Sequence, residues 1–202
     1  MLEVKNLAAR RGHITLFDQV NFRLSAGEAL VVTGANGTGK TTLLRMLAGL
    51  SHPLSGKMFW QEQEVRPFDP LLRNNINFAG HAPSLKDELT AEENLEILVR
   101  LTGESVSRQT LRDALDKVAL GARLNVPARS LSQGQRRRIG LARLTLIPRV
   151  LWILDEPVTA LDVAGIALLG EMMASHVKAG GSVIAATHQS LDLPNVRSFS
   201  FQ

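Results

Sequence analysis

The 202-residue sequence contains no cysteine and no tyrosine, and only 4% of its residues are aromatic. Without cysteine the chain can form no disulfide and perform no thiol chemistry. No stretch approaches the roughly 20 apolar residues that a membrane-spanning helix requires. The first residues, Met1 to Lys5, do not resemble a secretory signal. We therefore expect a chain that stays in the cytoplasm, and its length is sufficient to bury a sizeable core.

The net charge is also modest. The chain has 23 lysines and arginines and 19 acidic residues, which gives a net charge of +4. This excess is too small to require a nucleic-acid partner. The densest basic run is Arg136-Arg137-Arg138, followed by Arg143. A nucleic-acid patch remains open there, but a solvated helix face, or a site for phosphate and subunit contacts, is favoured.

A glycine-rich segment fits the pattern G-x-x-x-x-G-K-[ST] of a phosphate-binding loop. Its residues are Gly34, Ala35, Asn36, Gly37, Thr38, Gly39, Lys40, Thr41 and Thr42. The apolar run 29–32 predicts a strand before it, and residues 43–50 predict a helix after it. In that context the backbone N–H groups cradle phosphates, Lys40 reaches the β- and γ-phosphates, and Thr41 ligates Mg²⁺. The alternative is a glycine-rich turn that happens to contain Lys-Thr.

A second apolar run, 150–154, ends in Asp155 and Glu156. A parallel strand there delivers both carboxylates to the ligand edge of an α/β sheet. Asp155 is then placed to hold Mg²⁺ through water, and Glu156 to orient and deprotonate an attacking water. The alternative is a surface turn, which the neighbouring motifs make less favourable. One of these is the segment Leu131, Ser132, Gln133, Gly134 and Gln135, which precedes the strand.

These three motifs, in this order, resemble those of the nucleotide-binding subunits of ATP-binding cassette (ABC) transporters, over nearly the whole chain. The resemblance implies an ATPase in which Ser132 and Gly134 of one copy close over the γ-phosphate held by another. It also implies that Asp162 lies at the dimer contact and that His188, after the strand 182–187, contacts the γ-phosphate. A lone histidine is otherwise more often structural.

Two positions depart from that family's common pattern. Arg11 stands where many relatives stack an aromatic ring on adenine, and arginine can stack through its guanidinium plane. His81 stands where a glutamine usually links Mg²⁺ and water to the membrane partner. Because histidine both donates and accepts near neutral pH, a catalytic role and a structural or partner-facing role for His81 both remain open.

We predict an α/β fold of the P-loop NTPase, ABC type: a mixed sheet core, an N-terminal antiparallel β subdomain over residues 2–24 and a small helical subdomain. The chain 1–202 is expected to form one domain, with the helical part at approximately 84–145. Helical spacing at Leu95, Leu98 and Val99, and again at Leu111, Leu115 and Val118, predicts two helices there. The sequence Thr90-Ala91-Glu92-Glu93 predicts the cap of the first.

A closer resemblance, carried by 79–95, 151–157 and 160–165, is to the ATP-binding subunits of bacterial cytochrome c maturation, where His81 is typical. It implies ATP and Mg²⁺ as ligands, a homodimer, and integral membrane subunits of the maturation complex as partners. It also implies a peripheral location on the cytoplasmic face of the inner membrane, and no direct contact with nucleic acid. ATP then energises haem delivery, or release of the haem-loaded periplasmic chaperone.

Two other functions remain open. The chain is an ATPase subunit of another small-solute transporter if its membrane partner is of a different kind. The second is a soluble cassette protein that acts on nucleic acid or ribosomes. Proteins of that class usually carry two cassettes or a long coiled-coil insertion, and this chain has neither. The sequence therefore favours an ATPase subunit of cytochrome c maturation or of another small-solute transporter.

Overall fold

The computed structural model describes residues 1–188 and 193–201. The chain divides into two compact units. Unit 1 comprises residues 1–78, 149–157 and those from Met173 onward, and unit 2 comprises 79–148 and 158–172. The single domain expected over 1–202, with its helical part near 84–145, stays a prediction. No helix among the described residues has both the length and the apolar character needed to cross a bilayer.

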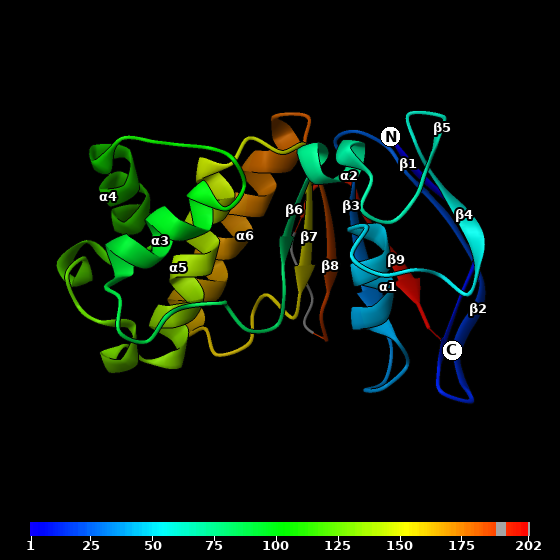
Figure 1. The fold of residues 1–202 in the computed structure, drawn as a ribbon, viewed down its shortest axis with the longest axis horizontal. Coiled ribbons are helices and arrows are strands. Elements are labelled where there is room, and N and C mark those ends of the chain that lie inside the picture. The colour runs from blue at the N-terminus through cyan, green and yellow to red at the C-terminus, as the bar shows by residue number, and fades with distance from the viewer. Residues whose placement is uncertain (189–192, 202) are drawn as a thin grey trace. The chain divides into compact units, whose positions relative to one another are not determined.

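A five-stranded sheet with the order β6-β7-β8-β3-β9 forms the centre of unit 1. Its strands are β3 (Ala29–Thr33), β6 (Ile76–Ala79), β7 (Leu151–Asp155), β8 (Ser182–Ala186) and β9 (Val196–Ser200). β3 pairs in parallel with β8 and with β9, and β7 pairs in parallel with β8. All residues of β7 and β8 are buried, as expected where both faces of a parallel sheet are covered. Figure 1 shows β7 and β8 running side by side, with α1 (Lys40–Leu47) near β3.

The strand register brings three loops to one edge of this sheet. Ala186 of β8 is paired with Val32 of β3 on one side and with Asp155 of β7 on the other. The residues that follow these positions therefore leave the sheet at the same level. These are the phosphate loop (residues 34–42), the acidic pair and the segment that carries His188. The edge is the one at which open α/β sheets bind ligands.

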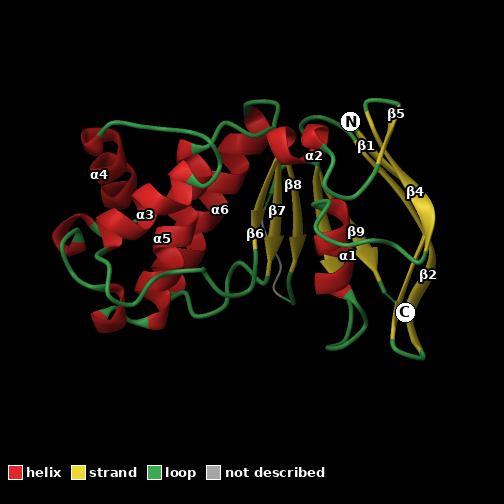
Figure 2. Cartoon of the chain, in the orientation of Figure 1, coloured by secondary structure: helices red, strands yellow, loops and turns green. Residues whose placement is uncertain are grey.

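The second sheet of unit 1 has four strands in the order β2-β1-β4-β5. Its strands are β1 (Leu2–Arg11), β2 (Ile14–Leu24), β4 (Ser55–Trp60) and β5 (Gln63–Val65). All its pairs are antiparallel, which confirms the predicted N-terminal antiparallel sheet. Leu2, Val4 and Leu7 of β1 are buried in one core with Met58 and Trp60 of β4 and with apolar residues of α1. The yellow strands at the right of Figure 2 are this sheet.

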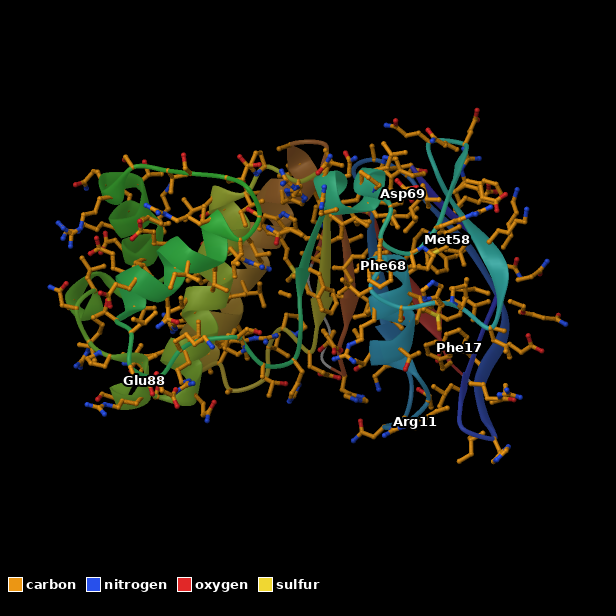
Figure 3. All side chains as sticks on the ribbon, viewed as in Figure 1. Arg11, Phe17, Met58, Phe68, Asp69 and Glu88 are labelled. Atoms are coloured by element: carbon orange, nitrogen blue, oxygen red, sulfur yellow. The ribbon has the colours of Figure 1, made fainter. Side chains whose placement is uncertain are left out.

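Two ring contacts and one cap complete unit 1. Trp152 of β7 stacks on His176 with ring centroids 4.0 Å apart and an interplanar angle of 10°. Phe17 of β2 lies 5.3 Å from Phe201, centroid to centroid. The short helix α2 (Pro70–Asn75) begins after Asp69, whose side chain accepts a hydrogen bond from the Leu71 N–H. Asp69 and Phe17 are both marked in Figure 3.

Unit 2 is helical. Its helices are α3 (Ala91–Arg100), α4 (Arg108–Lys117), α5 (Gln133–Leu146) and the first part of α6 (Val163–Lys178), with 3-10 turns η1 (Gly121–Arg123) and η2 (Ala128–Ser130). The predicted cap of α3 is confirmed, because Thr90 and Glu93 form a reciprocal capping box. Such a cap stabilises a helix by about 1 kcal/mol.

The predicted apolar faces of α3 and α4 are buried against one another and against α5. Leu95 and Val99 of α3, and Leu111 and Leu115 of α4, are at most 2% exposed. A buried carboxylate joins the two helices as well, because Glu92 of α3 accepts hydrogen bonds from Arg108 and Arg112. These contacts confirm the two helices expected from the spacing of leucine and valine.

Candidate functional site

The phosphate loop follows β3 and leads into α1, which confirms the predicted order of strand, loop and helix. Gly34, Gly37 and Gly39 have φ angles of 147°, 86° and 101°, which side chains rarely tolerate. At Gly39 a Cβ atom would also lie 2.9 Å from Cδ1 of Phe17 on β2. Glycine is therefore required at Gly39 both by the turn and by the sheet that packs against it.

Lys40 opens α1 and is only 8% exposed. Its ammonium group donates to the carbonyl oxygens of Gly34 at 2.7 Å and Ala35 at 3.0 Å. The side chain thus folds back across the loop instead of extending into solvent. A buried ammonium next to backbone N–H groups at a helix N-terminus provides the positive field that a phosphate requires.

Thr41 and Asp155 come from different elements and meet at the sheet edge. The Thr41 hydroxyl donates to Asp155 Oδ1 at 3.1 Å, and Asp155 is 2% exposed at the end of β7. Among the described residues, no group of three or more histidine or acidic side chains is arranged to hold a metal. Mg²⁺ does not need such a group, because it is commonly held by one or two protein oxygens together with phosphates and water. The hydroxyl and carboxylate pair fits that requirement.

Glu156 and His188 lie on the same edge. Glu156 has a left-handed φ of 46°, and its backbone N–H donates to the Ala186 carbonyl at 2.9 Å. This bend directs its carboxylate Oε1 to within 3.5 Å of His188 Nε2. The His188 ring is half-exposed, and its Nε2 also lies 3.3 Å from Lys40 Nζ and 3.1 Å from Asn36 Oδ1.

The tautomer of His188 decides which of these contacts forms. With a proton on Nε2, the ring donates to Asn36 or Glu156; without it, Nε2 accepts from the Lys40 ammonium. A histidine in this position can therefore both give and take a hydrogen bond beside a carboxylate. Unit 1 thus brings together six of the residues singled out by sequence: Asn36, Lys40, Thr41, Asp155, Glu156 and His188.

The segment Leu131–Gln135, called the signature segment below, forms the start of α5 in unit 2. Ser132 is the N-cap: its Oγ accepts from the Gln135 N–H at 3.2 Å, and its own N–H donates to Gln135 Oε1 at 3.0 Å. The first turn consists of two glutamines, one glycine and Arg136. A capped helix N-terminus without acidic side chains is suited to face an anion.

The signature segment shares a pocket with the loop that follows the acidic pair. The pocket is lined by Ala119, Ser132, Gln133, Gly134, Gln135, Arg138, Ala160 and Asp162. Asp162 Oδ1 accepts from Arg138 Nη2 at 2.6 Å and from the Gly165 N–H at 3.0 Å. The hydrogen bond from Arg138 and the one from the Gly165 backbone hold the pKa of Asp162 below its ordinary value. Sequence reasoning did not assign Arg138 to this pocket, although the basic run was a signal for it.

The two unusual positions are both exposed. His81 lies in unit 2, and its backbone carbonyl accepts a hydrogen bond from Arg137 Nη1 at 2.7 Å. Arg11 lies at the end of the β1–β2 hairpin, where it pairs with Ile14 (Figure 3). The roles expected for these two residues stay predictions, as do those of the other candidate site residues.

Comparison with known proteins agrees with this fold. The profile of the ABC transporter family matches residues 17–159. A putative ABC transporter ATP-binding protein from Pyrococcus furiosus superposes with a TM-score of 0.85 at 25% identity, over 98% of this chain and 96% of the other. A dimeric ATP-binding cassette in a post-hydrolysis state bound to ADP and Pi superposes with a TM-score of 0.80 at 25% identity, over 94% of this chain and 88% of the other.

The fold and the site therefore define an ATP-hydrolysing cassette, and the chain belongs to the ABC transporter family. The predicted fold class is confirmed. Within that family the chain is 44% identical to the cytochrome c biogenesis ATP-binding export protein CcmA of Nitrosomonas europaea, over 97% of this chain and 92% of the relative. It is also 44% identical to the protein of that name from Vibrio cholerae (98% and 96%) and 45% identical to that from Escherichia coli O157:H7 (96% and 91%). These relatives confirm the closer resemblance drawn from the sequence.

Proposed function

We propose that this chain is the ATP-hydrolysing subunit of a membrane complex for cytochrome c maturation. In this proposal, ATP hydrolysis energises haem delivery or release of the haem-loaded periplasmic chaperone. One observation carries the ATPase part: the contacts of Lys40 and Glu156 with His188, and of Thr41 with Asp155, lie at one sheet edge. The relatives named for cytochrome c biogenesis support the biological role.

ATP binds with its phosphates on the loop 34–42 and at the N-terminus of α1. Lys40 then exchanges its bonds to the Gly34 and Ala35 carbonyls for contacts with phosphate oxygens. Thr41 and Asp155 would hold Mg²⁺, Asp155 through water, and the ion would neutralise charge on the phosphates. The deep burial of Asp155 supports this role, since a buried carboxylate next to a hydroxyl fits a cation.

Glu156 orients the attacking water and accepts its proton, and His188 supports that water and contacts the γ-phosphate. The 3.5 Å separation of Glu156 Oε1 and His188 Nε2 supports this pairing, because one water can bridge both groups. Phosphoryl transfer asks the protein for positioning and charge stabilisation above all. A base fixed by its own backbone bend, as Glu156 is, meets the first requirement.

Two copies pair so that Leu131, Ser132, Gln133, Gly134 and Gln135 of one copy face the phosphates bound by the other, with Asp162 at the contact. The capped N-terminus of α5, whose first turn carries no acidic side chain, supports this arrangement. The similar cassette described as dimeric and bound to ADP and Pi supports it as well. The two units then act as a single ABC ATPase domain, with the helical part near 84–145.

The partners proposed are the integral membrane subunits of the maturation complex and, through them, the haem chaperone. The chain then sits peripherally on the cytoplasmic face of the inner membrane and makes no direct contact with nucleic acid. His81 is the candidate contact in the coupling loop, because its side chain is exposed while its backbone is held. The chain has no tyrosine to stack on adenine. Arg11 stands at the position where many relatives carry the aromatic ring, and its guanidinium plane can stack there instead.

The test replaces Glu156 by Gln, which removes the base but keeps shape and hydrogen bonding. The matched control is Glu171→Gln, at an exposed position on α6. We expect Glu156→Gln to bind ATP as the wild type does while its hydrolysis rate falls at least about a hundredfold. Glu171→Gln should hydrolyse ATP at the wild-type rate. Equal hydrolysis by the wild type and Glu156→Gln would remove Glu156 from the role of base.

The same variant tests the biological role. Affinity purification of Glu156→Gln from membranes should recover cytochrome c maturation membrane proteins together with a haem absorption band. Recovery of an unrelated membrane subunit without haem would leave the ATPase assignment standing and reject the maturation role.

A further inference from the structure

The basic run Arg136-Arg137-Arg138 is the one motif of the sequence that the proposed ATPase does not use. Successive residues of a helix point about 100° apart, so three neighbouring side chains leave α5 in three directions. Each of the three reaches a different part of unit 2. The arginines therefore join segments rather than form one charged face.

Arg137 makes the most deeply buried of these contacts. The residue is 4% exposed, and its Nη1 donates to the carbonyl oxygens of Gly80 and His81, each at 2.7 Å. A buried guanidinium is costly unless its N–H groups are matched by acceptors. The backbone of the loop 79–83 supplies two of them.

Arg136 and Arg138 hold other segments to the same helical turn. Arg136 pairs with Asp87 at 2.6 Å and donates to the Ala128 carbonyl at 3.2 Å. Arg138 pairs with Asp162 at 2.6 Å and donates to the Val118 carbonyl at 3.1 Å. The exposed fractions of these side chains, 22% and 12%, show that a solvated helix face, one of the two accounts favoured from the sequence, is wrong. The other account, a site for phosphate and subunit contacts, stays a prediction. The same burial argues against a nucleic-acid patch, whose arginines need solvent access.

The loop 79–83 also packs on α5 beyond Arg137. A Cβ atom on Gly140 would lie 3.6 Å from Cβ of Pro83, an ordinary packing distance. Gly140 is three residues further along the helix than Arg137, so the two positions lie on the same side of α5. The loop is thus held at both ends: by hydrogen bonds at Gly80 and His81, and by packing at Pro83.

We propose that Arg137 is a positioning residue that makes the loop 79–83 and the signature segment move as one piece. Ser132 is five residues before Arg137, about 7–8 Å along the helix at 1.5 Å per residue. A displacement of the loop is therefore passed to the N-terminus of α5 through a short, rigid path. Because the carbonyl of His81 is fixed while its side chain is exposed, a contact made on that side chain reaches the signature segment.

Lysine cannot replace this contact. The guanidinium offers a planar fork of donors, whereas an ammonium is a compact point charge on a flexible stem. Arg137→Lys keeps the charge and most of the apolar stem but loses the fixed geometry toward two carbonyls. The variant therefore tests positioning without deleting a buried cation.

The experiment is amide hydrogen exchange on the full chain, with and without ATP and Mg²⁺, for the wild type, Arg137→Lys and the control Arg123→Lys. Arg123 is an exposed arginine of the same unit. Three segments are followed: 34–42, 79–83 and 132–136. In the wild type we expect ATP to slow exchange in all three.

Without nucleotide, Arg137→Lys should raise exchange in 79–83 by about tenfold, the effect of one lost charge-assisted hydrogen bond. With ATP, 132–136 should be protected in this variant while 79–83 is not, and kcat should fall more than KM changes. Arg123→Lys should behave as the wild type. His81→Ala should leave exchange in 79–83 unchanged, since Arg137 donates to backbone carbonyls of the loop and not to the His81 side chain.

Unchanged exchange of 79–83 in Arg137→Lys would overturn the proposal. The proposal would also be overturned if, in the wild type, ATP protected 132–136 but not 79–83. This second test needs only the wild type, so it can be made even if Arg137→Lys does not fold. The proposal rests on the proposed function only through ATP binding. Protection of the segment 34–42 by ATP distinguishes a failure of the proposed function from a failure of the role proposed for Arg137. If ATP does not protect 34–42 in the wild type, the proposed function fails, while the nucleotide-free comparison still decides whether Arg137 holds the loop.

Discussion

The contact between Gly134 and Ala160 permits a sharp test of how the signature segment is packed. A Cβ atom added at Gly134 would lie 2.6 Å from the carbonyl oxygen of Ala160. Ordinary contact for such a pair begins at 3.4 Å, so the loop or the helix must move by about 0.8 Å. The obstacle is backbone, which cannot turn aside as a flexible side chain can.

The matched control is Gly140→Ala on the same helix. There the new Cβ meets only Pro83, at 3.6 Å, which needs no displacement. Replacing glycine by alanine inside a helix stabilises it by about 0.5–1 kcal/mol. Both variants add the same methyl group, so their difference isolates the clash at Ala160.

Overpacking of this kind costs about 1–3 kcal/mol. With a central value of about 2 kcal/mol, the Tm of Gly134→Ala should lie about 4–8 °C below that of Gly140→Ala for a chain of this size. ATP turnover should fall at least about tenfold in Gly134→Ala, because displacements of this order misplace reacting groups. Far-UV circular dichroism measures the first effect, and phosphate release measures the second.

The reasoning is refuted if the two variants have the same Tm and the same turnover. A lower Tm with unchanged turnover would keep the packing argument and separate it from the proposed role of the signature segment. Turnover that falls in Gly140→Ala as well would mean that α5 tolerates no added methyl group, whatever lies opposite.

Two further changes test the packing of unit 2. Burial opposes ionisation of Glu92, but hydrogen bonds from Arg108 and Arg112 outweigh it and hold the pKa of Glu92 below its ordinary value of 4.5. Glu92→Gln should therefore destabilise the chain by about 1–2 kcal/mol at pH 7, discounted because both arginines are partly exposed. That difference from the wild type should begin to shrink as the pH falls through about 4.5, where the carboxylate of the unfolded chain takes up its proton, and should vanish only below the lower pKa of the folded state. Urea unfolding at pH 7 and pH 4 measures the onset of this loss. Thr90→Ala removes the capping box of α3 and should lower the free energy of unfolding by about 1 kcal/mol in the same assay. Thr90→Ser keeps the hydroxyl and should lower it little. Equal stabilities of these two variants would contradict the capping role.

The parts of the site that depend on local spacing could be predicted from sequence. Gly39, Lys40 and Thr41 follow a strand and open a helix, so their order alone places them at a helix N-terminus. Asp155 and Glu156 end an apolar run, and the rule for parallel strands puts them at the same edge. The reciprocal cap of α3 at Thr90 likewise depends on residues only three apart.

What could not be predicted depends on partners distant in sequence. The strand β4 was not expected, since its first three residues are exposed and polar or small and it forms by pairing with β1, about fifty residues earlier. The partners of Arg137 and Arg138 are carbonyls and a carboxylate on other segments. No spacing rule connects Arg137 to Gly80, because only the packing of the loop on α5 brings them together.

Both tryptophans lie in unit 1, Trp60 on β4 and Trp152 stacked on His176 of α6. Since the chain has no tyrosine, all emission excited near 280–295 nm comes from these two indoles, apart from the weak signal of phenylalanine. Unit 2, with the signature segment and the arginine contacts, therefore contributes no tryptophan or tyrosine fluorescence. A melting curve recorded by intrinsic fluorescence follows unit 1 alone, whereas far-UV circular dichroism at 222 nm is weighted toward the helices of unit 2. Coincident curves would mean that the two units unfold as one cooperative body, and separated curves would give each unit its own transition without any added label.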